Sequence, residues 1–197
     1  MDTEAIIENM IESSHHLYKK GLVPGKAGNI SVKFEKNDLK VVGVTPSGSS
    51  LKYIKDEDII LVDIDGKIIS SSDNVPTSEL EMHLNIYKER NDINAVVHTH
   101  SPITTGFAFS DEKIENMEGF GPIKDQYIPT VNYYPPGSSD LAKAVSKGLI
   151  DQNVVILKNH GMVALGENLD EATLLAEFVE ESAKIQFIKK ILMSNRF

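Results

Sequence analysis

The sequence predicts a single α/β domain in which helices alternate along the chain with the strands of a layered sheet. Stretches with the 3.6-residue apolar period of a surface helix alternate with short apolar runs that are typical of buried strands. No repeat, low-complexity tract or linker interrupts this alternation, and 197 residues suffice for one domain with a substantial core. We therefore expect residues 1–197 to form one domain.

The first half of the chain is expected to begin and end with a helix. Residues 2–20 carry apolar side chains at helical spacing, and Gly21 follows as a C-cap residue. Ser78-Glu79-Leu80-Glu81 has the form of a capping box, which predicts a second helix from there to about Arg90. Between these helices we expect a glycine-rich turn at residues 24–29, strands at 30–34, 39–44 and 58–62, and a hairpin through Gly66 into residues 68–69.

The second half continues the alternation, starting from a strand that contains His98. The expected elements that follow are a helix at 102–109, an irregular acidic loop at 111–126, a strand at 128–133, a helix at 138–147 and a strand at 154–157. A long terminal helix is expected from Asn168 toward Phe197.

Composition and charge argue against several functional classes. A formal net charge of -9 is unfavourable for a general nucleic-acid or anionic-membrane binder, although it leaves room for a small anionic substrate held by local donors. The chain has no cysteine, so it forms no disulfide and offers no thiolate metal ligand. The N-terminus lacks the pattern of a signal peptide, and no apolar stretch approaches the roughly 20 residues of a membrane span. The expected location is therefore the cytoplasm.

Two histidines, His98 and His100, directly follow the apolar run of residues 95–97. Side chains two residues apart on a strand point to the same face, with Cα atoms roughly 6.5 Å apart, so both imidazoles can reach one metal ion. His160 follows the second apolar run, residues 154–157, and is the third candidate ligand. Three imidazoles leave one coordination position open, which is typical of a catalytic rather than a structural zinc.

The other three histidines lack this context. His15 and His16 are adjacent on a predicted helix, so their side chains diverge, and both are expected at the surface or in packing. His83 follows Glu79 by one helical turn, which leaves a supporting position beside the metal as an alternative to a packing role.

Glu79 is the carboxylate best placed to act as a base, although a carboxylate in the first turn of a helix often only complements the helix dipole. The flanking Thr77 and Ser78 favour a functional role, because hydroxyls and free N–H groups at a helix N-terminus bind anions. Residues 25–29 and 45–50 have the same character, with glycine-enabled backbone donors and short polar side chains suited to a phosphate. Each segment alone is an ordinary turn, but three in one domain suggest a phosphate site.

These segments together resemble the class II aldolase and epimerase (adducin-like) family, over nearly the whole chain and in family order. A His-x-His pair alone would be a weak signal, but the joint pattern is specific. The motifs are Gly25-Lys26-Ala27-Gly28-Asn29-Ile30-Ser31, Thr45-Pro46-Ser47-Gly48, Pro76-Thr77-Ser78-Glu79, His98-Thr99-His100 and Asn159-His160-Gly161.

The resemblance implies one zinc ion per subunit held by His98, His100 and His160, with Glu79 as the catalytic acid/base and a further candidate ligand. It also implies a three-layer α/β/α domain with a central, mainly antiparallel sheet, assembled as a homotetramer with active sites at subunit interfaces. The phosphate pocket that it implies is formed by Gly28, Asn29, Ser47, Gly48, Thr77 and Ser78, and Lys26 would add a charge contact.

The activity implied is reversible cleavage of a ketose 1-phosphate, of the L-fuculose 1-phosphate type, into dihydroxyacetone phosphate and an aldehyde such as L-lactaldehyde. Such an enzyme is a metal-dependent carbon–carbon lyase of carbohydrate metabolism. Glu79 favours this aldolase branch, because the pentulose-5-phosphate 4-epimerases of the family carry aspartate at that position. A non-catalytic module with a structural zinc is another alternative, but it leaves the phosphate-like segments without a role.

The loop after His100 departs from the aldolase pattern. The aldolase type uses a tyrosine in this loop as the acid on the aldehyde side, whereas no tyrosine occurs here before Tyr127. The family's C-terminal tail, which carries another tyrosine, is expected to be missing beyond Phe197. Glu115 and Glu118 in the loop are similar to the acid/base of dehydratase relatives that act on methylthioribulose phosphate. A sugar-phosphate dehydratase or the 4-epimerase is therefore the alternative function.

Overall fold

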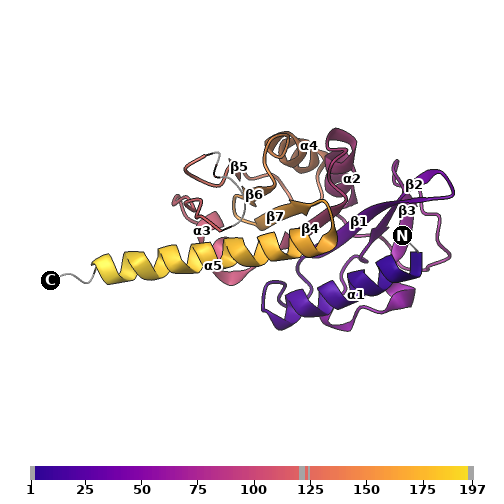
Figure 1. The fold of residues 1–197 in the computed structure, drawn as a ribbon, viewed down its shortest axis with the longest axis horizontal. Helices are drawn as coiled ribbons and strands as arrows, with labels where there is room; N and C mark the ends of the chain where they lie inside the picture. The colour runs from indigo at the N-terminus through magenta and orange to yellow at the C-terminus, as the bar shows by residue number, and fades with distance from the viewer. Residues whose placement is uncertain (1–2, 120–122, 124, 195–197) are drawn as a thin grey trace.

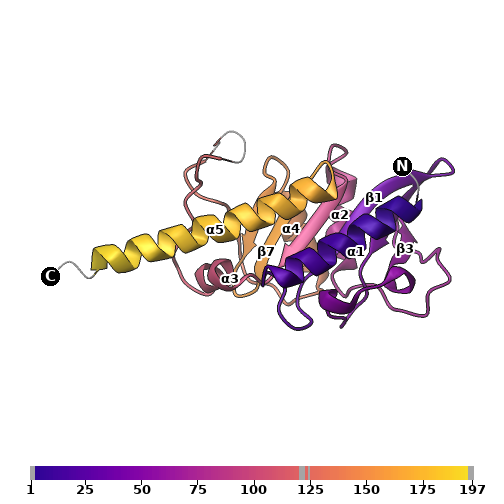
Figure 2. The same ribbon diagram turned by 60° about the horizontal axis from the view of Figure 1, so that its bottom comes forward.

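A sheet with helices on both faces forms the body of the computed structural model, which describes residues 3–119, 123 and 125–194 (Figures 1 and 2). In the described residues the sheet has seven strands in the order β3-β2-β1-β4-β7-β6-β5, and only β5 and β6 pair in parallel. The strands are β1 Asn29–Lys36, β2 Leu39–Val44, β3 Ile60–Asp63, β4 Ala95–Thr99, β5 Thr130–Val131, β6 Val154–Leu157 and β7 Gly161–Gly166. The helices are α1 Thr3–Lys19, α2 Leu80–Glu89, α3 Pro102–Ala108, α4 Ser139–Gly148 and α5 Leu169–Ser194, with 3₁₀ turns η1 Leu51–Tyr53 and η2 Asp56–Asp58.

Successive side chains along the strands point to opposite faces of the sheet and pack into two separate hydrophobic cores. Along β4, Ala95 and Val97 pack into a core shared with α1, α3 and α5, whereas Val96 packs into a core shared with α2 and α4. The same alternation runs along β7, where Met162 and Val163 belong to opposite cores. This pattern follows from the two-residue period of a strand that is buried on both faces. The three-layer architecture with a mainly antiparallel sheet, which the resemblance implied, is confirmed.

Strand β7 is the element that the sequence analysis missed. Its six residues are all buried, and it pairs with β4 on one side and β6 on the other. Its apolar run, residues 162–165, is of the same kind as the runs that predicted the fully buried β4 and β6, so the signal for β7 was present in the sequence. Gly161 starts the strand because an added Cβ would lie 2.2 Å from the carbonyl oxygen of Thr99.

Other expectations need smaller corrections. The strand expected at residues 128–133 is only Thr130–Val131 long, and the hairpin through Gly66 closes with a single bridge between Val62 and Ile68. The expected ends of the first and last helices, at Asp2 and Phe197, and residues 120–122 and 124 of the acidic loop lie outside the described residues.

The expected capping box does not form. Glu79 is the N-cap of α2, and among the described residues no side-chain hydrogen bond caps that helix. The Glu81 carboxylate, which would have closed the box, accepts a 2.6 Å hydrogen bond from the hydroxyl of Ser139 at the start of α4. The Glu79 carboxylate instead turns toward the sheet, where His98 lies.

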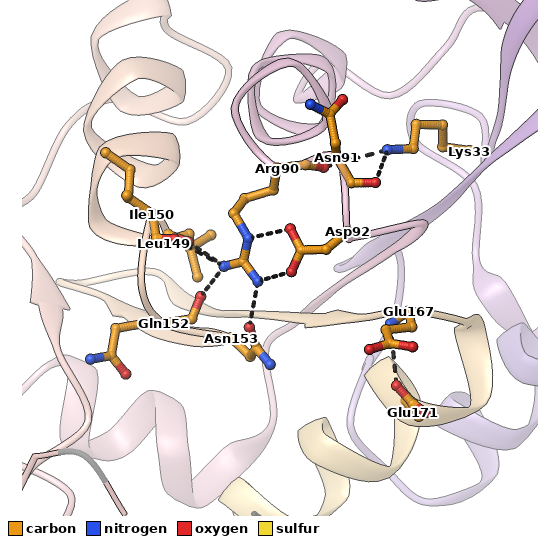
Figure 3. A network of polar contacts seen from close by, with 10 residues as sticks. All are labelled: Lys33, Arg90, Asn91, Asp92, Leu149, Ile150, Gln152, Asn153, Glu167 and Glu171. Carbon is orange, nitrogen blue, oxygen red and sulfur yellow. Dashed lines mark hydrogen bonds and ion pairs between the residues drawn. The ribbon is translucent and has the colours of Figure 1, made fainter. Parts of the chain in front are cut away.

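Arg90, directly after α2, ties that helix to the connection between α4 and β6 (Figure 3). Its guanidinium holds the Asp92 carboxylate through two bonds of 2.8 and 2.6 Å. It also donates to the carbonyl oxygens of Leu149 at 2.8 Å and Gln152 at 3.1 Å, and to Asn153 Oδ1 at 3.0 Å. The planar fork of an arginine therefore locks the end of the helix that carries Glu79.

Helix α5 crosses the sheet and extends well beyond it (Figures 1 and 2). Several large apolar side chains of its C-terminal half are exposed, including Phe187, Ile188, Ile191 and Leu192. Among the described helices, none is both long and apolar enough to cross a membrane.

Candidate metal centre and active site

Three imidazoles converge where β4 ends, at the turn between β6 and β7. The candidate ligand atoms of His98, His100 and His160 all lie within 4.8 Å of one another. The three ring centroids are 4.7 to 4.8 Å apart, and each pair of rings is steeply inclined. The structure thus brings together the three histidines that the sequence analysis selected.

The pairing of β4 with β7 explains this convergence. His98 is the fourth residue of β4 and His100 follows the strand end, so both lie on the face of Val96. Thr99 pairs with Met162 of the antiparallel β7, which places the preceding turn beside His100. His160 occupies that turn, after Asn159 in the left-handed conformation at φ 56°.

The hydrogen bonds of His98 direct its ring toward the cluster. Nδ1 donates to the carbonyl oxygen of Met162 at 2.8 Å, which leaves Nε2 facing inward, 3.0 Å from Nε2 of His100. Backbone bonding of the outer ring nitrogen is the usual way in which a metal-ligating histidine is oriented. Two nitrogens bound to one tetrahedral zinc at about 2.1 Å lie about 3.4 Å apart, so the donor set fits a single ion of this kind.

The Glu79 carboxylate completes the cluster. Oε2 lies 3.1 Å from Nε2 of His98, and Oε1 lies 3.6 Å from Nε2 of His160. Only 7% of the Glu79 side chain is exposed, and Oε1 has no hydrogen-bond partner among the described residues. A buried carboxylate oxygen without a partner costs stability unless a cation or a substrate proton engages it.

The cluster favours ionised Glu79 beside neutral His100 and His160. Burial on its own would raise the pKa of Glu79, but the charge and hydrogen bond of His98, helped by Asn29 and His160, hold that pKa well below its usual range. Burial and the neighbouring His98 lower the pKa of His100 to about 3 and that of His160 to about 4. Neutral imidazoles offer the lone pairs that a metal needs. For His98, burial opposes a charge, but Glu79 raises its pKa overall, so a metal competes there with a proton.

A buried polar chain runs from Glu79 into the space between α2 and the sheet. Asn29 Nδ2 donates to Glu79 Oε2 at 2.9 Å, and Asn29 Oδ1 lies 2.6 Å from Nε2 of His83. His83 Nδ1 is 2.7 Å from the Ser31 hydroxyl, which is in turn 2.8 Å from the Tyr87 hydroxyl. The His83 side chain thus contacts Asn29 and Ser31 and none of the candidate metal ligands directly, so its expected supporting role beside the metal stays a prediction.

Ser31 and Tyr87 were missed by the sequence analysis, although two regular spacings contain the signal. Positions 79, 83 and 87 are each four residues apart and share one face of a helix. Asn29 and Ser31 are two residues apart on β1 and so share one face of the strand. Of the remaining histidines, His15 bonds to the carbonyl oxygen of Ile54 and His16 to Glu177, and neither belongs to this series of buried hydrogen bonds.

The three segments that are expected to bind phosphate meet next to Glu79. Asn29 pairs with His98 across β1 and β4, and an added Cβ at Gly28 would lie 2.8 Å from the His98 carbonyl oxygen. Thr77 N donates to Thr45 O at 3.2 Å, which joins the second segment to the third. Lys26, Ser47, Gly48 and Ser78 are less constrained, and all four are exposed.

The Thr77 and Asn29 side chains are already engaged within the protein. Thr77 is buried, and its hydroxyl accepts from the Glu79 N–H at 3.3 Å. Asn29 uses its amide on Glu79 and His83. The role of these two residues toward a phosphate stays a prediction.

The carboxylates of the loop after α3 have other neighbours. Glu115 forms an ion pair with Lys189 of α5 at 3.7 Å, and its backbone N–H donates to Gln186. Glu118 is exposed. Tyr127 is 36% exposed, with Lys113 Nζ 5.6 Å from its ring centroid.

Comparison with known proteins places this geometry in context. Residues 8–187 match the family model described as Class II Aldolase and Adducin N-terminal domain. An L-fuculose phosphate aldolase of Methanococcus maripaludis is 42% identical over 182 residues, which are 92% of this chain and 96% of that protein. A solved structure of an L-fuculose 1-phosphate aldolase superimposes with a TM-score of 0.86 at 30% identity, covering 98% of this chain and 89% of that one.

Other relatives carry different names. A 5-deoxy-D-ribulose 1-phosphate aldolase of Bacillus thuringiensis is 33% identical, covering 93% of this chain and 84% of that protein. A 3-oxo-tetronate 4-phosphate decarboxylase of Haemophilus influenzae is 34% identical, covering 91% of this chain and 86% of that protein.

Proposed function

Because this chain belongs to the class II aldolase and adducin N-terminal domain family, we propose that it reversibly cleaves a ketose 1-phosphate of the L-fuculose 1-phosphate type. The products are dihydroxyacetone phosphate and an aldehyde such as L-lactaldehyde. The observation that carries this proposal is the contact between the Glu79 carboxylate and the cluster of His98, His100 and His160.

His98, His100 and His160 are the residues proposed to hold a divalent metal, with Glu79 as a further ligand when no substrate is present. An all-imidazole donor set with one free position favours zinc, one ion per subunit. When bound, the metal supplies Lewis-acid stabilisation of the negative charge that develops on the ketone oxygen. The unpartnered Oε1 of Glu79 supports the presence of a cation or a reacting proton at this point.

Glu79 is proposed as the acid/base that moves a proton at the reacting carbon. In cleavage, the hydroxyl of the aldehyde half gives up its proton as the carbon–carbon bond breaks, and the electron pair of that bond forms the enediolate of the three-carbon half. Glu79, after taking up a proton equivalent to the one released, delivers it to the enediolate carbon. In condensation, the ionised carboxylate removes the same proton. Burial on its own would raise the pKa of Glu79, but the charge and hydrogen bond of His98 hold that pKa below its usual range and keep the carboxylate in the base form at neutral pH.

The exposed donors around this carboxylate are proposed as the phosphate subsite. The hydroxyls of Ser47 and Ser78 and the backbone of Gly48 lie on segments that the structure joins to Glu79, and the exposed Lys26 adds a positive charge. Gly28, Asn29 and Thr77 would contribute from the inner side of the same segments. Binding energy from a remote phosphate orients the three-carbon unit for proton transfer.

We also propose that the chain assembles as a homotetramer with active sites at subunit interfaces. The exposed apolar side chains on the C-terminal half of α5 support an assembly in which this helix is covered. Sedimentation equilibrium measures this directly, with a species of four subunits expected, and a monomer at micromolar concentration would overturn it.

Metal removal tests the proposed function. The protein is stripped with a chelator and assayed with a panel of ketose 1-phosphates for the release of dihydroxyacetone phosphate. We expect no cleavage without metal and recovery when one equivalent of zinc is restored. Cleavage that survives complete metal removal, confirmed by elemental analysis, would overturn the proposal.

A second candidate is decarboxylation of a 3-oxo sugar-acid phosphate, which the decarboxylase relative favours. Loss of carbon dioxide next to a ketone also leaves an enolate that requires a proton, so the same groups serve both reactions. Product analysis separates the candidates, because the aldolase releases two carbonyl fragments and the decarboxylase releases carbon dioxide. The dehydratase or epimerase alternative is distinguished by a product that keeps all of its carbon atoms.

A further inference from the structure

We propose that His83 is a positioning residue for the reaction: its Nε2–H holds the amide of Asn29 in the orientation that presents an N–H to Glu79. The proposal rests on the function proposed above for Glu79. In this proposal His83 affects the reaction by orienting Asn29, although His83 itself neither binds the metal nor touches the substrate.

The ionised state of Glu79 determines which group donates in each successive hydrogen bond of this buried series. The ionised carboxylate only accepts, so the Asn29 group beside it is the N–H₂, and the Asn29 oxygen faces Nε2 of His83. His83 must therefore carry its proton on Nε2. Burial lowers the pKa of His83 to about 3, so the ring is neutral and Nδ1 is an acceptor, which the Ser31 hydroxyl fills as donor.

The contacts of Tyr87, at the far end of this series of hydrogen bonds, are consistent with these donor directions. The Tyr87 hydroxyl lies 2.8 Å from the Ser31 hydroxyl, and its other acceptors are the carbonyl oxygens of Ser31 at 2.9 Å and Asn94 at 3.5 Å. When Tyr87 donates to the Ser31 hydroxyl, each hydrogen bond from Tyr87 to Glu79 has one donor and one acceptor. Hydrogen bonds aligned in one direction polarise one another.

The four side chains of this hydrogen-bonded series are also shielded from water. His83 is fully buried, and Ser31, Tyr87 and Asn29 are 0%, 2% and 6% exposed. No competing solvent contact is therefore available to hold the Asn29 amide if His83 loses its donor. A flipped amide would direct Oδ1 at the Glu79 carboxylate, and the two acceptors would repel each other.

The first readout is the tautomer of His83 in the unaltered protein, measured by long-range ¹H–¹⁵N correlation spectra of the imidazole. We expect a proton on Nε2 and an unprotonated Nδ1. A proton on Nδ1 would overturn the proposal. This measurement needs no turnover, so it stands even if the chain proves to catalyse another reaction.

The second readout compares His83→Gln with His83→Leu, because glutamine keeps an N–H donor near the position of Nε2 whereas leucine has none. The assay is proton exchange in dihydroxyacetone phosphate by the zinc-loaded protein. We expect His83→Leu to lower kcat by about 10- to 100-fold with KM little changed, and His83→Gln to restore most of the rate. His15→Gln, on α1 and outside the chain, is the matched control and should keep the wild-type rate.

Equal kcat values for the leucine variant and the wild type, with metal content unchanged, would overturn the proposal. So would an equal loss in both His83 variants, since a packing role would not distinguish a donor from its absence. If the wild-type protein itself exchanges no proton, the proposed function fails, and the tautomer readout alone then decides whether His83 orients Asn29.

Discussion

The side-chain amide of Asn29, at the start of β1, donates to the carboxylate of Glu79, at the start of α2, over 2.9 Å. The same carboxylate lies 3.1 Å from His98, so one buried group is oriented from two sides. Burial would raise its pKa, but these contacts keep the carboxylate ionised. The orientation and the charge state of the proposed base thus depend on one small set of polar contacts.

Replacing Glu79 by glutamine removes the base and keeps the volume. We expect Glu79→Gln to slow proton exchange in dihydroxyacetone phosphate by about 100- to 10,000-fold, because the amide takes up no proton. The metal should remain, since three imidazoles stay in place. Exchange rate and zinc content are measured on the same sample. An unchanged exchange rate would assign the base to another residue, with Glu118 as the next to test.

Adding one methyl group at Gly161 should disturb the metal site. The new Cβ would lie 2.2 Å from the Thr99 carbonyl oxygen, so β7 and the His160 turn must shift. We expect Gly161→Ala to cost at least about 2 kcal/mol of unfolding free energy and to weaken zinc binding. Gly106→Ala on α3 is the control, because its Cβ would meet nothing within 4 Å. Equal stability and zinc affinity for the two variants would contradict this reasoning.

Acid should destabilise the protein partly through His83. Its pKa is lowered by burial to about 3 in the folded state and returns to an ordinary value near 6.5 on unfolding. Between these values only the unfolded chain binds the proton, so His83 favours folding fully above pH 6.5 and progressively less as the pH falls.

Glutamine at this position does not titrate, which gives the comparison. The unfolding free energy of the wild type relative to His83→Gln should therefore fall by about 2 kcal/mol from pH 7 to pH 5. Urea titrations of the metal-free proteins measure this, so that loss of zinc at low pH does not contribute. A difference that is independent of pH would show that His83 titrates normally in the fold.

Arg90 should be irreplaceable by lysine at the end of α2. Lysine keeps the charge but loses the planar fork that holds Asp92 and the carbonyl oxygens of Leu149 and Gln152 together. We expect Arg90→Lys to lower the unfolding free energy by about 1–3 kcal/mol. Lys88→Met, which breaks the exposed pair with Asp65, should change it by less than about 1 kcal/mol. Chemical denaturation compares the two, and a larger effect at Lys88 would contradict the prediction.

Local signals carried much of the fold and the ligand set. The pleat of a strand was enough to predict that His98 and His100 share one face. The position of His160 after a second apolar run and of Glu79 at a helix start added these two residues, and the joint motif pattern supported the choice. The central strand β7 was missed although its apolar run resembles those of β4 and β6, which were predicted. The capping box failed because the tertiary contacts of Glu79 and Glu81 outweigh the local cap.

The sequence by itself therefore determined which groups the candidate site contains, namely three imidazoles, one carboxylate and several loops that we expect to bind phosphate. Only the tertiary structure decided how these groups face one another. His98 is oriented by the carbonyl oxygen of Met162, and Glu79 by Asn29, partners that lie 64 and 50 residues away in the chain. Periodicity reports on neighbours within a few residues, whereas strand pairing and buried hydrogen bonds join segments whose separation leaves no local pattern.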